Sequence, residues 1–164
     1  MTHYLPENKF LKILDLTGNQ IDFQGFMYIG RFLEKTEVLE SLILAGNKAC
    51  DSGKIYLNKG AKYCAQGIAK NKTLIHLDLT NNNIHNDGLC RLTEGLKLNT
   101  TLKSLRVFWS NFFEDESIKM FKEIIDLKRD SFYPDLVIYM SDNFDLSIAY
   151  YEPDLPDDVK GLLI

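Results

Sequence analysis

The chain has 164 residues, of which 45% are hydrophobic and 26% charged, and its formal net charge is −4. This length suits one structural unit, and the apolar content is too high for a disordered protein. The acidic balance disfavours a nucleic-acid partner, and no apolar run could span a membrane or act as a signal peptide, so we expect a soluble, intracellular, cytoplasmic chain.

A leucine pattern recurs along the chain and predicts a series of short strands. The first copy reads L-K-I-L-D-L-T-G-N-Q-I from Leu11, and further copies begin at residues 39, 74 and 102. The fourth copy is degenerate, with Ser110 and Phe112 where the first has asparagine and isoleucine. A weaker fifth copy begins at Tyr133, with Leu136 and Ile138 in the strand. Self-similarity at such a period is typical of repeat architectures.

The second half of each copy predicts a helix. Apolar residues spaced four apart follow a glycine in two copies, at Gly25 and Gly88, and mark one helical face. We expect this glycine just before the helix, where a tight loop needs positive φ or close backbone approach. The copy from residue 39 is longer, and its best register places Gly60, Cys64 and Ile68 on the helical pattern. An insertion near residues 54–59 should then bulge outward at the helix start.

The repeated asparagines and leucines are expected to be structural. Asn19, Asn47 and Asn82 can each bond the backbone of the turn that follows a strand. Ser110 stands in this position in the fourth copy, so we expect a looser turn there. The strand leucines should point inward and be buried. These predicted core residues are Leu14, Leu16, Leu42, Leu44, Leu77, Leu79, Leu105 and Val107.

The two ends differ from the repeats. The pattern Leu5-x-x-Asn8-x-x-Leu11 matches the tail of a repeat, so we expect a truncated form, a fragment of a longer protein, or an end covered by a partner. Leu11, Leu14 and Ile21 should then keep a partly bare apolar face. We divide the chain into leucine-rich repeats (1–132), a C-terminal cap or hairpin (133–151) and an acidic tail (152–164).

The pattern L-x-x-L-x-L-x-x-N-x-I, followed by G-x-x-x-L-x-x-x-L-x-x-N-x-x-L, resembles the ribonuclease-inhibitor-like class of leucine-rich repeat. The resemblance covers roughly residues 5 to 128. It implies a right-handed α/β solenoid with a parallel β-sheet on the concave face, helices on the convex face and an irregular β-containing C-terminal cap. Such solenoids present extended concave surfaces to other proteins.

No residue pattern indicates catalysis, a metal or a cofactor. His76 and Asp78 share one strand face, but they lack an oxyanion donor and a nucleophile in a suitable turn. His76, His85 and Cys90 have no metal-ligand spacing. The cysteines are odd in number and form no CxxC pair, so we expect reduced thiols, with Cys64 a small buried hydrophobe. We therefore expect a protein that is not an enzyme, with no cofactor.

The candidate function lies on the outward strand positions. Early strands carry small and acidic groups, whereas the fourth and fifth carry the Arg and aromatic residues typical of interface hot spots. The alternative is that Phe108, Trp109, Phe112 and Phe113 close the end of the core. The candidate protein-binding residues are Asp15, His76, Asp78, Arg106, Phe108, Trp109 and Tyr139.

Three functions are compatible with these features. The first is a non-enzymatic scaffold that binds a protein partner through the concave face. The second is a structural subunit of a large assembly, whose neighbours would cover the uncapped start and the apolar end Leu162-Leu163-Ile164. The resemblance extends to leucine-rich repeat subunits of ciliary axonemes, which implies a cytoskeletal or ciliary location. The third is a regulator that inhibits or activates an enzyme, because Ran GTPase-activating proteins have similar repeats. Tropomodulin's actin-capping repeats are also similar in size and in the N-T-T-L phrase.

Overall fold

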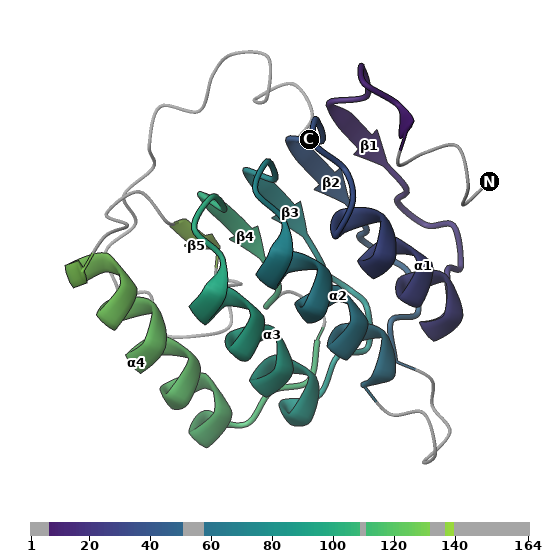
Figure 1. The fold of residues 1–164 in the computed structure, drawn as a ribbon. Helices are drawn as coiled ribbons and strands as arrows, with labels where there is room; N and C mark the ends of the chain where they lie inside the picture. Colours follow the sequence, from purple (N-terminus) through teal and green to yellow (C-terminus); the bar gives the residue numbers. More distant parts are fainter. Residues whose placement is uncertain (1–6, 51–57, 109–110, 132–136, 140–164) are drawn as a thin grey trace.

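Strands and helices alternate along the chain. The computed structural model describes residues 7–50, 58–108, 111–131 and 137–139. Within these ranges, the five strands lie parallel in one sheet, in chain order, and the four helices lie side by side over one of its faces (Figure 1). This confirms the predicted leucine-rich repeat solenoid. The elements are β1 (Ile13–Asp15), α1 (Phe23–Leu33), β2 (Ser41–Ile43), α2 (Lys59–Lys70), β3 (His76–Asp78), α3 (Asn86–Leu98), β4 (Ser104–Arg106), α4 (Asp115–Ser131) and β5 (Val137–Tyr139).

The strands are aligned by their central residues. Leu42 of β2 pairs with Leu14 of β1 on one side and with Leu77 of β3 on the other. The alignment continues through Leu105 of β4 to Ile138 of β5, so the weak fifth copy does supply a strand. The rest of the predicted cap and the acidic tail lie outside the described residues.

Most of the predicted core is confirmed, with an exception in the first repeat. The predicted leucines of β2 and β3, together with Leu105 and Val107, are buried. Leu14 and Leu16 were also expected to be buried, but both are only partly so. Leu14 lies on the edge strand β1 and Leu16 directly after it, where described neighbours cover only the side facing β2. The partly bare apolar face expected at Leu11, Leu14 and Ile21 is therefore present.

Asparagines tie neighbouring repeats together after the strands. The amide nitrogen of Asn47 donates to Leu16 O of the preceding repeat at 2.8 Å, while its Oδ1 accepts from Ile21 N. Asn82 repeats the pattern by donating to Leu44 O at 2.8 Å. Both side chains are buried, which confirms their structural role. We call this row of side chains the strand-end ladder.

The fourth repeat corrects one prediction. Ser110 was expected to stand in the strand-end ladder and to leave it loose, but Asn111 stands there instead. Its Oδ1 accepts from Asn82 N at 3.0 Å and Ile84 N at 2.9 Å, and its Nδ2 donates to Leu79 O at 3.0 Å. One extra residue before position 111 has shifted the register, and the ladder is intact.

A second row of asparagines closes the helix ends. Asn71 Nδ2 donates to Leu33 O of the preceding repeat at 2.9 Å, and its Oδ1 accepts from Leu74 N at 2.6 Å. Asn99 does the same with Ile68 O and Leu102 N, both at 2.8 Å. We call this row the helix-end ladder. It fixes the turns that lead from α2 into β3 and from α3 into β4.

Repeated glycines allow the helices to pack closely. Gly25 and Gly88 lie inside the first turns of α1 and α3 rather than before them, and neither has positive φ. Close approach is the reason for the glycine: a Cβ at Gly88 would stand 2.6 Å from Asn58 Oδ1. In α2, a Cβ at Gly67 would stand 2.6 Å from Gly30 O of α1. Any larger residue would push the helices apart.

Candidate functional site

The strand face that points away from the helices carries two aligned rows of side-chain positions. Strand alternation sends the central leucines toward the helices and the flanking positions to the opposite face. The register fixes both rows across β1 to β4, each with one residue per strand. The first row is Ile13, Ser41, His76 and Ser104, and the second row is Asp15, Ile43, Asp78 and Arg106. In the backbone register of β5, Val137 pairs with Ser104 and Tyr139 pairs with Arg106.

Two carboxylates of the second row are held in fixed orientations. Asp15 Oδ1 accepts from Thr17 N at 2.9 Å and from Thr17 Oγ1 at 2.7 Å. Asp78 Oδ1 accepts from Thr80 N at 2.8 Å and from Thr80 Oγ1 at 2.7 Å. Each aspartate therefore stabilises the end of its own strand through one oxygen. Sequence reasoning considered both residues as outward surface groups, and Asp78 also as a partner of His76, but it missed this local role, although both occur in the phrase Asp-Leu-Thr.

The register brings three of the predicted binding residues close together. Asp78 of β3 pairs with Arg106 of β4, and Arg106 pairs in turn with Tyr139 of β5. His76 lies two residues before Asp78 on the same strand face, and His76, Asp78 and Arg106 are half-buried. Asp15 is exposed and lies two strands from Asp78, about 10 Å away at the usual strand spacing.

One predicted binding residue does not join this face, and another cannot be placed. Phe108 was expected to point outward, but only 5% of it is exposed, and its ring meets those of Phe113 and Phe121 edge-on at centroid distances of 5.4 Å. Strand β4 ends at Arg106, so alternation no longer governs position 108. The alternative that aromatics close the core is therefore correct for Phe108. Trp109 lies outside the described residues.

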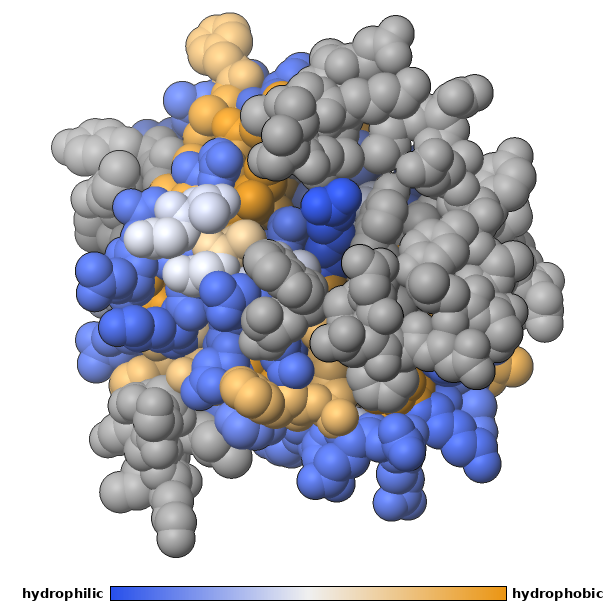
Figure 2. All heavy atoms as spheres, turned by 180° about the vertical axis from the view of Figure 1, so that it is seen from behind, coloured by the Kyte–Doolittle hydropathy of each residue, from blue (hydrophilic) through white to orange (hydrophobic). Residues whose placement is uncertain are grey.

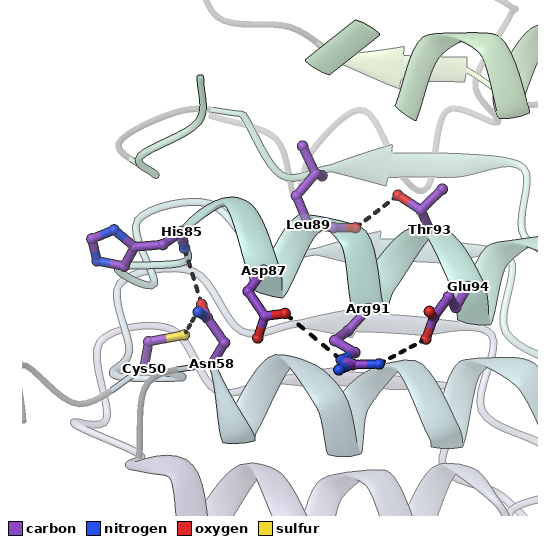
Figure 3. Close-up of polar contacts among 8 residues, drawn as sticks. All are labelled: Cys50, Asn58, His85, Asp87, Leu89, Arg91, Thr93 and Glu94. Atoms are coloured by element: carbon purple, nitrogen blue, oxygen red, sulfur yellow. Dashed lines mark hydrogen bonds and ion pairs between the residues drawn. The ribbon is translucent and has the colours of Figure 1, made fainter. Parts of the chain in front are cut away.

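A cysteine and a histidine bond to the same asparagine near the start of α3, but the thiol and the imidazole do not form a catalytic pair. Cys50 Sγ donates to Asn58 Oδ1, which also accepts from the backbone nitrogen of His85, both at 3.2 Å (Figure 3). The His85 ring points away and stacks on Phe112 at 5.2 Å. Burial raises the pKa of the Cys50 thiol to about 11, so it is protonated at neutral pH.

The remaining polar clusters have structural explanations. On α3, Arg91 pairs with Asp87 at 3.9 Å and with Glu94 at 3.3 Å, all on the exposed helical surface (Figure 3). Cys64 is fully buried, as predicted, and burial raises its pKa to about 12. Among the described residues, no group of three His, Cys, Asp or Glu side chains could hold a metal ion. No described helix is long and apolar enough to cross a membrane.

Comparison with known proteins agrees with the repeat geometry. A profile described as "Leucine Rich repeat" matches residues 7–30, 70–89 and 98–122. The chain is 33% identical over 97 residues to "Leucine-rich repeat-containing protein 45" of Gallus gallus; the match covers 59% of this chain and 14% of that protein. The solved structure "Leiomodin-1 Actin-Binding Site 2 (ABS2)" superposes with a TM-score of 0.69 at 17% identity, covering 85% of this chain and 75% of the other. The match thus spans about a seventh of the length of that curated relative. The similarity to the leiomodin-1 structure, at 17% identity, concerns the fold alone.

Proposed function

Because this chain is a leucine-rich repeat protein, we propose that it is a non-enzymatic interaction module that binds a protein partner through the face formed by the two strand rows. The observation that supports this proposal is the second row itself. One side chain per strand stands in register there, and the charged members are Asp15, Asp78 and Arg106. Charged side chains at these positions contribute little to the leucine core, so the face can vary to suit a partner.

The fixed carboxylates define the chemistry of the partner. Thr17 and Thr80 hold one oxygen of Asp15 and Asp78, so the orientation of each charge is set before a partner arrives. A preorganised group loses less side-chain entropy on binding than a free one does. The partner we propose is therefore a protein segment with Lys or Arg side chains about 10 Å apart. Arg106, next to Asp78 along the row, extends this surface toward β5.

Several finer assignments remain predictions. They include the ribonuclease-inhibitor-like subclass, the axonemal role with its ciliary location, and the regulation of a GTPase. The similar leiomodin-1 structure is, by its name, an actin-binding site of that protein. Actin is therefore a defined first probe for this chain, although a likeness at 17% identity concerns the fold alone.

Site-specific photocrosslinking tests the proposed face. A photoreactive phenylalanine derivative replaces Ile43, which lies between Asp15 and Asp78 in the second row. A matched variant carries the same group at Tyr28, an exposed position on α1 of the helical surface. We expect protein adducts, with purified actin or with cell extract, from position 43 and not from position 28.

The charge dependence of the adduct completes the test. Asp78→Asn keeps an oxygen that can accept from Thr80 but removes the negative charge. Asp87→Asn, on the exposed surface of α3, is the matched control. The adduct from position 43 should weaken with Asp78→Asn and persist with Asp87→Asn. Adducts that form only from position 28 would place the binding surface on the helices and contradict the proposal.

A further inference from the structure

The second row alternates acidic, apolar and acidic side chains from β1 to β3. The register aligns Asp15 with Ile43 and Ile43 with Asp78. Neighbouring strands lie about 4.8 Å apart, so Ile43 stands midway between two carboxylates that are about 10 Å apart. Asp15 is exposed, and Ile43 and Asp78 are half-buried, so all three retain exposed surface. We call these three side chains the acid–apolar–acid row.

Each carboxylate of this row has one oxygen that no described residue uses. The Oδ1 atoms of Asp15 and Asp78 each accept two hydrogen bonds from the threonine two residues later. Among the described residues, no donor bonds to the Oδ2 atom of either aspartate. Hydrogen bonds from Lys or Arg to a carboxylate are about twice as strong as those between neutral groups. The row therefore offers two oriented acceptors for positively charged side chains, with an apolar contact between them.

Apolar surface accompanies these charges on the strand face. Figure 2 views the molecule from the side opposite the helices, and apolar atoms gather there in the upper part left of centre, beside hydrophilic atoms. Ile13, which is 40% exposed, lies in the first row, two residues before Asp15 on the same strand. A partner that brought only positive charges would leave this apolar surface in water. A matching partner therefore also needs an apolar side chain between its basic ones.

The spacing of an α-helix fits this row. A helix rises about 1.5 Å per residue, and residues i, i+3 or i+4, and i+7 lie on one of its faces. Residues i and i+7 are then about 10.5 Å apart along the axis, close to the separation of the two aspartates, and residue i+3 or i+4 falls opposite Ile43. In an extended strand, side chains on one face recur about every 6.7 Å, so no two of them match a separation of about 10 Å.

Backbone hydrogen bonding also favours a helix over an extended segment. The strands β1, β2 and β3 pair with each other, so the face of the sheet offers no backbone ladder to a segment that crosses it. A helix satisfies its own backbone groups, whereas an extended segment on this face would depend on water. A polyproline II segment brings residues i and i+3 onto one face about 9 Å apart, but it places no residue between them there. It would therefore leave Ile43 without a partner.

We propose that the acid–apolar–acid row binds an amphipathic α-helix of the partner, which lies across β1, β2 and β3 with Lys or Arg at positions i and i+7 and an apolar residue at i+3 or i+4. This proposal rests on the function proposed above and adds the conformation and residue spacing of the bound segment. The two basic side chains donate to Oδ2 of Asp15 and of Asp78, and the apolar residue packs on Ile43.

Three synthetic peptides test this spacing with the full chain. The matched peptide is an alanine- and glutamine-based helix with Lys at i and i+7 and Leu at i+3. The shifted peptide has the same composition, but its second Lys stands at i+5, on a different face of the helix. A proline-based peptide carries two Lys three residues apart. We expect the matched peptide to bind at least about tenfold more tightly than either control in a fluorescence anisotropy titration at about 0.05 M salt.

Variants of the chain and of the peptide locate the contact. Asp78→Asn should weaken binding of the matched peptide by about fivefold or more, because it removes one of the two charges. The control Asp87→Asn, on the exposed surface of α3, should leave this affinity unchanged. A matched peptide with alanine in place of its leucine should bind at least about threefold more weakly, because it loses the contact with Ile43.

The outcomes separate this proposal from the proposed function. Equal affinities for the matched and shifted peptides, tighter binding of the proline-based peptide, or no binding of any peptide would overturn the helix. Photocrosslinked adducts from position 43 would in that case still support the face as a protein-binding surface. Absence of those adducts would instead contradict the proposed function itself.

Discussion

Replacing Asn111 with alanine should strongly destabilise the fourth repeat, although the sequence predicted a loose turn with Ser110 at the ladder position. The side chain links two repeats through bonds to Asn82 N, Ile84 N, Leu79 O and Val107 O. At about 1 kcal/mol for each bond, their loss would cost about 4 kcal/mol. Because the residue is half-buried, water can replace part of what is lost. We therefore expect Asn111→Ala to lower the free energy of unfolding by about 2 to 4 kcal/mol.

Urea denaturation followed by circular dichroism measures this loss, and Asn19→Ala is the matched control. Asn19 stands at the same ladder position but is exposed and makes one described bond, so its replacement should cost less than about 0.5 kcal/mol. A loss at Asn111 below about 1 kcal/mol, or equal losses at both positions, would refute the assignment of Asn111 to the ladder.

Three further predictions concern the core. Leu77→Ala should lower the free energy of unfolding by about 2 to 5 kcal/mol in the same urea assay, because only 2% of Leu77 is exposed; a loss under about 1 kcal/mol would contradict its burial. Gly67→Ala should lower the melting temperature despite the better helix propensity of alanine, because the new Cβ would overlap Gly30 of α1; an increase would contradict the close helix packing. At pH 8, a thiol reagent should modify the partly exposed Cys90 first. Burial raises the pKa of Cys50 to about 11 and of Cys64 to about 12, which lowers the thiolate fractions of these two cysteines. All three cysteines should react in denaturant, and fast labelling of Cys64 in the native protein would contradict the prediction.

The repeat spacing predicted the fold because the same residues perform the same task in each repeat. The strand leucines and the asparagines at positions 47 and 82 form the core and the ladder as the spacing implied. The spacing failed at Ser110, because one extra residue moved the ladder position to Asn111. A single-residue shift is hard to detect when the remaining pattern is degenerate, although Asn111 itself was a visible signal. The burial of the first-repeat leucines was overestimated because burial depends on neighbours on both sides.

The candidate face was predictable only as far as the strands extend. Asp15, Asp78 and Arg106 stand in one row because strand alternation holds over three residues in each repeat. Phe108 lies beyond the end of β4, and its ring is buried in the core. The hydrogen bonds from Thr17 and Thr80 depend on the turn geometry after each strand, which leucine spacing does not specify.

The affinity of a crosslinked partner for charge variants tests the central claim most directly. Titration calorimetry would compare the wild-type chain with Asp78→Asn and with the control Asp87→Asn at about 0.15 M salt. We expect Asp78→Asn to weaken binding by about fivefold to thirtyfold without lowering the melting temperature, and Asp87→Asn to leave the affinity unchanged. Unchanged affinity for Asp78→Asn, even when combined with Asp15→Asn, would contradict binding through the strand rows.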